Sequence, residues 1–209
     1  MKMTHAQLRQ VARALLLVGI AAPLFALASV LIAVVCYPDF NHARQYLSEL
    51  GGATATQPWI FNLGVMIAGA MTAVAGVGFG LALVLLCRSP VSAVVVGALF
   101  VAAGVGLVMS SLYPWPDPRH MAINLGLGIQ LAPVFLLIAL RQTLAVTGLK
   151  RFLLGVFVLM AVLTVLTKHL LFPGTVNDFN VGYWERAFAI VLVGWVGVAA
   201  HLTRRALRP

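Results

Sequence analysis

Residues 37–52 read Tyr37-Pro38-Asp39-Phe40-Asn41-His42-Ala43-Arg44-Gln45-Tyr46-Leu47-Ser48-Glu49-Leu50-Gly51-Gly52. This polar stretch separates two apolar runs, residues 14–36 and 59–86, each long enough to cross a bilayer as a helix. It holds two of the five acidic residues and one of the five histidines. It therefore predicts a hairpin of two membrane helices, and it indicates the end of the molecule at which the functional groups lie.

The composition excludes an ordinary water-soluble domain, because 62% of the residues are apolar and only 9% are charged. A segment that crosses lipid must satisfy its backbone hydrogen bonds internally, so each long apolar run is expected to be helical. The sequence thus predicts an all-α, polytopic membrane protein in which residues 1–209 form one domain, a bundle of six transmembrane helices. The predicted spans are residues 14–36, 59–86, 91–113, 121–140, 152–172 and 183–202.

The basic residues predict the orientation of the chain. Ten of them lie at span ends on one side of the membrane, without any acidic residue: Lys2, Arg9, Arg13, Arg88, Arg141, Lys150, Arg151, Arg204, Arg205 and Arg208. The positive-inside rule assigns this side to the cytoplasm, which predicts a multi-pass protein of the cytoplasmic (inner) membrane with both termini in the cytoplasm. Short basic clusters at span ends are typical of topology signals, so the net charge of +9 does not predict a nucleic-acid partner.

The opposite side carries the acidic and aromatic residues. All five acids fall there: Asp39, Glu49, Asp117, Asp178 and Glu185. All four tyrosines and three of the four tryptophans accompany them. Because anchoring aromatics normally occur at both membrane surfaces, a belt on one side predicts an aromatic-walled vestibule at the extracytoplasmic face.

A short amphipathic helix is predicted within the first outer loop, over residues 39–50. Apolar residues recur there at helical spacing, and Gly51-Gly52 supplies a stop. The polar face of this helix would carry His42, Gln45 and Glu49. Arg44 and Ser48 of the same stretch are further candidates for ligand binding.

The pattern Pro-Asp-x-x-His occurs twice, at residues 38–42 and 116–120. Two imidazole nitrogens and two carboxylates suit a divalent metal such as zinc, so Asp39, His42, Asp117 and His120 are candidate metal ligands. A divalent metal is thus the candidate cofactor, with Glu49 or Glu185 as the general base. Capping is the alternative role for each Asp, because Asp before an apolar helix is a preferred N-cap.

Further polar residues lie near the outer ends of the spans. Asn62 and Asn124 are candidates for ligand contact, or alternatively for hydrogen bonds between helices. A charge in hydrocarbon is costly, so Lys168 is expected to reach the surface or to pair with Glu185. Together with Arg186, this pair forms either a structural clamp between two helices or the charged wall of a ligand site.

Four motifs resemble a known family: Tyr-Leu-Ser-Glu-Leu-Gly at 46–51, Asn62-x-Gly64, the Pro-x-Asp-then-His pattern at 114–120, and Gly-Tyr-Trp-Glu-Arg at 182–186. The chain is similar in these motifs to the bacterial and archaeal multi-pass membrane proteins grouped as domain of unknown function 998. The resemblance implies a six-span helical bundle with these motifs together at the outer face, and it carries no activity. The Ser-Glu-Leu-Gly turn is also similar to one in six-span eukaryotic proteins related to lipid-anchor remodelling, which points toward lipid handling.

Three functions fit these observations. The first is a polar site at the extracytoplasmic face that binds a lipid headgroup or another amphiphile and, in one version, hydrolyses it with a metal. The second is a small transporter of an apolar substrate, since the middle of the spans carries no charge. The third is a structural or accessory subunit that docks a membrane-protein partner, and the small-residue spacing also suits a homodimer.

Overall fold

The computed structural model describes residues 3–87, 89–122, 127–167, 171–172 and 174–208, and every regular element in these residues is helical. The long helices result from apolar runs that bond their own backbones. Their bounds, with those of the short helices between them, are α1 (His5–Val35), η1 (Leu47–Gly51), α2 (Pro58–Cys87), α3 (Pro90–Leu112), α4 (Pro118–Ala122), α5 (Leu127–Leu140), η3 (Leu144–Val146), α6 (Thr147–Thr167) and α7 (Val181–Ala206).

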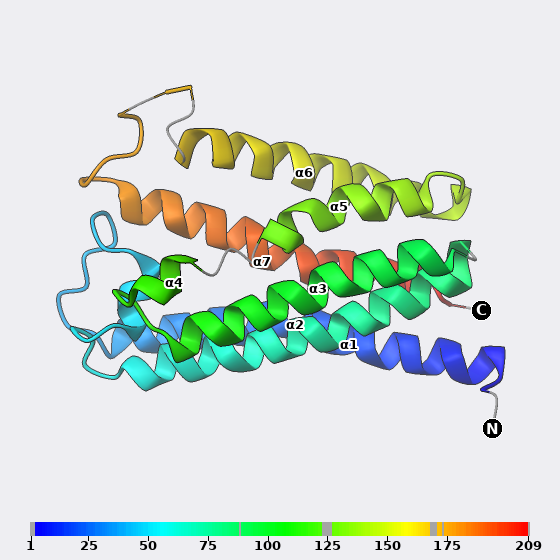
Figure 1. Cartoon of the computed structure of the whole chain (residues 1–209), viewed down its shortest axis with the longest axis horizontal. Helices are drawn as coiled ribbons and strands as arrows, with labels where there is room; N and C mark the ends of the chain where they lie inside the picture. The colour runs from blue at the N-terminus through cyan, green and yellow to red at the C-terminus, as the bar shows by residue number, and fades with distance from the viewer. Residues whose placement is uncertain (1–2, 88, 123–126, 168–170, 173, 209) are drawn as a thin grey trace.

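The helices lie side by side along the long axis of the molecule (Figure 1). Helix contacts connect α1, α2, α3, α5, α6 and α7 in this order and return from α7 to α1. Residues 36–57, 113–117 and 174–180 share one end of the bundle, which we name the loop end (Figure 1). Both chain termini lie at the opposite, terminal end. The three outer loops that the sequence groups on one side are therefore at one end of the structure.

Small residues allow the helices to approach closely. A Cβ atom on Gly76 of α2 would lie 2.6 Å from the Cβ of Phe100 of α3, and one on Gly104 would collide with the carbonyl oxygen of Gly69. A Cβ atom on Gly197 of α7 would lie 2.7 Å from Cγ of Pro23 of α1. These glycines thus serve packing within the chain, as is common in membrane helices.

The outer surface of the bundle is apolar over most of its length. Side chains such as Val35 (83% exposed) and Leu24 (65% exposed) face outward, which would be unfavourable in water. Inside, the rings of Phe79 and Phe100 stack with centroids 4.6 Å apart, and Trp195 lies against Phe100. Within the described residues, five helices are long and apolar enough to cross a membrane, and the chain is accordingly a multi-pass membrane protein.

The predicted fourth span, residues 121–140, is described only in part. Its described part includes α5, whose 14 residues correspond to about 21 Å, less than the thickness of a hydrocarbon core. The short helix α4 precedes it, and residues 123–126 lie outside the described residues. The six-span count therefore stays a prediction.

The amphipathic helix predicted for residues 39–50 is not formed as one helix. The structure has turns up to Tyr46 and then the short 3-10 helix η1. Asp39 has a φ of 60°, outside the helical region. The Asn41 side chain accepts hydrogen bonds from the backbone N–H groups of Ala43 and Arg44, which competes with helical bonding. The apolar spacing is real, but side-chain bonds to the backbone decide the local conformation.

The close contact between α2 and α3 gives a test of the packing. Gly104→Val is expected to lower the free energy of unfolding by about 1–3 kcal/mol, because the added methyl groups have no room beside Gly69 and Ala73. Gly155→Val is the control, since a Cβ atom there meets nothing within 4 Å. Thermal unfolding of the two purified variants in detergent measures the difference. Equal stability of both variants would contradict this packing.

Candidate functional site

Arg186, near the start of α7, anchors the first loop. Its Nη1 donates hydrogen bonds to the carbonyl oxygens of His42 (3.0 Å) and Gln45 (3.1 Å), and to that of Gly182 in its own helix (2.6 Å). The guanidinium also lies over the ring of Phe40, 5.1 Å from its centroid. Carbonyl groups in irregular backbone need donors, and one arginine supplies several of them in a fixed geometry.

Gly182 completes this anchor. Its backbone N–H donates to the carbonyl oxygen of Ala43 at 2.8 Å. A Cβ atom at this position would lie 2.5 Å from the carbonyl oxygens of both His42 and Gln45, so only glycine permits this approach. The first loop therefore lies directly on the first turn of α7.

Glu185 lies next to this anchor and binds the same loop. One of its carboxylate oxygens, Oε2, accepts a hydrogen bond from the backbone N–H of Leu47, the first residue of η1. The side chain is partly buried. Glu185 thus joins the start of α7 to the start of η1.

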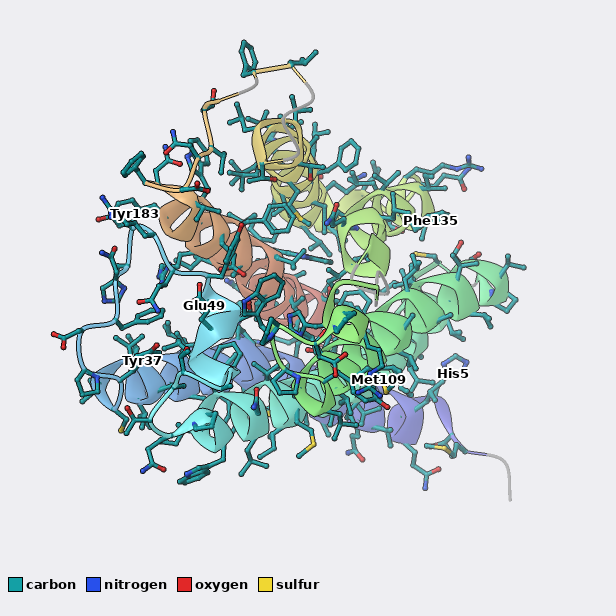
Figure 2. All side chains as sticks on the ribbon, turned by 60° about the vertical axis from the view of Figure 1, so that its left-hand side comes forward. His5, Tyr37, Glu49, Met109, Phe135 and Tyr183 are labelled. Atoms are coloured by element: carbon teal, nitrogen blue, oxygen red, sulfur yellow. The ribbon has the colours of Figure 1, made fainter. Side chains whose placement is uncertain are left out.

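Glu49 stabilises the shape of the first loop. Its Oε1 accepts the backbone N–H of Tyr46 at 2.7 Å, and its Oε2 accepts a hydrogen bond from Nε2 of Gln45 at 3.2 Å. In Figure 2, which brings the loop end forward, Glu49 lies between the labelled Tyr37 and Tyr183. Because both carboxylate oxygens have partners in the loop, this geometry assigns Glu49 a positioning role.

Asn62 attaches the end of the loop to α2. Its Nδ2 donates to the carbonyl oxygen of Gly51 at 2.9 Å, and a Cβ atom on Gly51 would collide with the Asn62 side chain. This is the role of a buried amide that connects two elements. Gly51 is thus both the stop of η1 and the contact surface for α2.

His120 of α4 is a further polar side chain at the loop end. Its Nδ1 lies 2.9 Å from the carbonyl oxygen of Tyr113 and 3.1 Å from that of Ser110. Carbonyl oxygens only accept hydrogen bonds, so Nδ1 carries the proton. In the neutral ring, Nε2 is then an acceptor. Trp115 lies edge-on to this ring, with centroids 6.5 Å apart, and also contacts the ring of Tyr46 at 5.7 Å.

Asp117 and Arg119 form an ion pair on the surface of α4. Nη2 of Arg119 lies 2.7 Å from Oδ2 of Asp117, and the backbone N–H of Arg119 also donates to this carboxylate. The hydrogen bonds from Arg119 lower the pKa of the Asp117 carboxyl to about 2. The guanidinium lies 3.9 Å from the ring centroid of Tyr113. Both oxygens of the Asp117 carboxylate are therefore already bonded to Arg119.

The four candidate metal ligands have different surroundings. Asp39 is exposed in a turn, and the exposed His42 ring packs edge-on against Phe40. In the described part of the chain, no three His, Cys, Asp or Glu side chains are arranged to hold a metal ion. Asp39, His42, Asp117 and His120 therefore do not form a metal-binding group in this structure.

The remaining candidates are distributed as follows. Arg44 lies over the ring of Phe179 at 4.7 Å and connects the first loop with the segment before α7. Ser48 is partly buried in η1. Asn124 and Lys168 lie outside the described residues, so the predicted pair of Lys168 with Glu185 stays a prediction.

Sequence reasoning missed the contacts of several loop-end residues. Gln45, expected on the polar face of a helix, connects Asn41, Tyr37 and Glu49 by side-chain hydrogen bonds, and Trp115 joins two loops. The spacing of Gly182 and Arg186 by one helical turn was a usable signal, because a glycine leaves space for a neighbouring arginine to bind foreign backbone. The backbone carbonyl groups that Arg186 binds could not be recognised from the sequence.

Comparisons with known proteins give one match. The family model described as "Protein of unknown function (DUF998)" matches residues 20–202. No curated protein and no solved structure matches the chain. The match confirms the resemblance that the loop-end motifs indicated.

The anchor formed by Arg186 predicts a local effect of mutation. Arg186→Ala is expected to loosen residues 37–51, because the carbonyl oxygens of His42 and Gln45 lose their donor, at a cost of about 1.5–3 kcal/mol for a bond to a charged group. Amide hydrogen exchange of this segment, measured by mass spectrometry, is expected to accelerate. Arg119→Ala is the matched control at the same end, since an exposed ion pair contributes little. Unchanged exchange in Arg186→Ala would show that the loop has another anchor.

The lowered pKa of Asp117 predicts a pH dependence. The carboxyl titrates at 3.8 when unperturbed and at about 2 in the fold, so the ion pair stabilises the protein fully above pH 3.8 and is lost as the pH falls through 2. The difference in melting temperature between the wild type and Asp117→Asn is therefore expected to be constant from pH 7 to pH 4 and to shrink toward pH 2. A difference that has already vanished at pH 5 would contradict this assignment.

Proposed function

Because the chain belongs to the DUF998 family, whose description assigns no function, we propose a function from the chemistry of the loop end: binding of the headgroup of a membrane lipid or a similar amphiphile. The observation that carries the proposal is the position of the Glu185 carboxylate, which is partly buried at the start of α7 and accepts a hydrogen bond from the N–H of Leu47. An amine-bearing headgroup fits this chemistry best.

Two polar atoms of this site can accept hydrogen bonds, whereas Nη2 of Arg186, which is buried without a partner among the described residues, can only donate. Glu185 uses Oε2 for Leu47, and among the described residues Oε1 has no hydrogen-bond partner. His120 offers Nε2 as an acceptor, because Nδ1 holds the proton. An ammonium group has three donors and a positive charge, so it complements a carboxylate and an imidazole acceptor.

The surroundings suit an amphiphile at a membrane surface. Trp59 and Tyr183 are about 60% exposed at the loop end, as aromatic residues at a membrane interface are. Trp115 lies between Tyr46 and His120 and contacts both rings, which supports the proposed aromatic wall. Aromatic faces also attract an ammonium group. The acyl chains of such a ligand would continue along the apolar outer surface of the bundle.

The other candidate functions receive less support. Hydrolysis with a metal would need a ligand group, and the described residues contain none. Transport would need a passage, whereas the cavity between Thr72, Leu107 and Val196 in the middle of the bundle has a volume of only 40 Å³. Such a volume holds on the order of one water molecule. Binding is therefore the function that we propose.

Lipid retention by the purified protein tests this proposal. The protein in detergent is titrated with phosphatidylethanolamine or phosphatidylcholine, and bound lipid is measured by native mass spectrometry. Phosphatidylethanolamine is expected to bind more tightly, because its primary ammonium group donates hydrogen bonds. Glu185→Gln is expected to weaken this binding about tenfold, the effect of losing a charge-assisted hydrogen bond of about 1.5–3 kcal/mol.

Asp178→Asn is the matched control, since it removes one negative charge from an exposed position at the same end. This variant is expected to bind phosphatidylethanolamine like the wild type. Glu185→Gln keeps an oxygen that accepts the Leu47 N–H, so its fold is expected to be retained. Equal binding of both lipids, together with unchanged binding in Glu185→Gln, would refute the proposal.

A further inference from the structure

A second cavity lies at the terminal end, far from the loop end. It has a volume of 240 Å³ and lies between the start of α6 and the last turns of α7. Residues of η3 and the first turn of α6 line one side, among them Val146, Gly148 and Leu149. Leu202, Arg205 and Ala206 of α7 line the other side. The cavity thus combines an apolar wall with one guanidinium group.

The acidic side chains are far from Arg205. Asp39, Glu49, Asp117, Asp178 and Glu185 belong to the loops and helix starts of the loop end, whereas Arg205 belongs to the last turn of α7 at the terminal end, and within the described residues no ion pair of Arg205 is formed. Two neighbouring cations bind backbone instead: Nε of Arg204 donates to the carbonyl oxygen of Arg13, and Nζ of Lys150 to that of Arg141. Arg205 is exposed and contributes a positive charge to the lining of the cavity.

The start of α6 adds to this positive potential. The first turn of a helix carries partial positive charge, and the first turn of α6 contains no acidic residue. A Cβ atom on Gly148 would meet nothing within 4 Å, so the cavity is open beside the backbone of this turn. The end of α7 contributes the opposite dipole, which Arg204 and Arg205 in its last turn offset.

We propose that this cavity binds the phosphate group of an anionic membrane lipid. A basic pocket between membrane helices at a membrane surface is the type of site that holds such a headgroup. Val198 of α7, which is 46% exposed, lies one helical turn from Leu202 toward the middle of the bundle and provides an apolar start for the path of an acyl chain. This site is independent of the proposed function. It binds a negatively charged phosphate at the terminal end, whereas the proposed function concerns a positively charged ammonium group at the loop end.

The test compares anionic with zwitterionic lipid on the full-length protein in detergent. Phosphatidylglycerol is expected to bind more tightly than phosphatidylcholine by native mass spectrometry and to raise the melting temperature. Arg205→Gln is expected to weaken phosphatidylglycerol binding about fivefold, the contribution of one cationic residue near a lipid surface. Gly148→Leu is expected to reduce binding as well, because its side chain fills the cavity without a clash.

Two matched controls separate this site from general surface charge. Arg151→Gln removes an exposed charge from the same helix without touching the cavity, and Gly155→Leu adds the same side chain where a Cβ atom also meets nothing within 4 Å. Both are expected to bind phosphatidylglycerol like the wild type, as is Glu185→Gln. Equal binding of the two lipids, or equal losses in Arg151→Gln and Arg205→Gln, would overturn the proposal. Equal stabilisation by soluble glycerol phosphate would overturn the lipid as the source of the phosphate.

Discussion

The hydrogen bonds between Arg186 and the first loop connect two segments that are more than 140 residues apart in the chain. Residues 37–46 form no regular helix, so their backbone groups need other partners at the membrane surface. Arg186, Gly182 and Glu185 supply these partners from the first turns of α7. Through these hydrogen bonds, the irregular first loop takes a defined position over the end of the bundle. The positions of Glu49 and Tyr46 depend on these bonds.

The close packing of the helices is the second requirement. Lipid does not drive helices together as water does, so contact surfaces depend on shape. Gly69 and Gly104 bring α2 and α3 together, and Gly197 receives Pro23 of α1. This packing sets α7 against α1, and the first loop lies at the loop end between the end of α1 and the start of α7 (Figure 1). The loop end is thus assembled by the apolar part of the bundle before its polar groups make contact.

The two ends of the molecule have opposite chemistry. The loop end combines all acidic residues with aromatic rings and free hydrogen-bond acceptors, whereas the terminal end carries arginines and lysines without acids. The family model covers every loop-end residue that we discuss, while Arg205 lies beyond its last residue. The two lipid sites that we propose, one for an amine-bearing headgroup and one for a phosphate, follow this difference in charge.

The sequence by itself determined the apolar helices, the separation of charges and the family, because each of these depends on composition along a continuous segment. It also selected Glu185, Arg186, Glu49, Asn62 and His120, since polar residues beside apolar spans are rare and visible. Tertiary structure decided what these residues do. Asn62 binds Gly51, Arg186 binds carbonyl groups and Glu185 binds the N–H of Leu47, and such partners to the backbone leave no pattern in the sequence. For the same reason the predicted helix at residues 39–50 became turns, because Asn41 and Asp39 favour local bonds and a left-handed backbone over the spacing of their apolar neighbours.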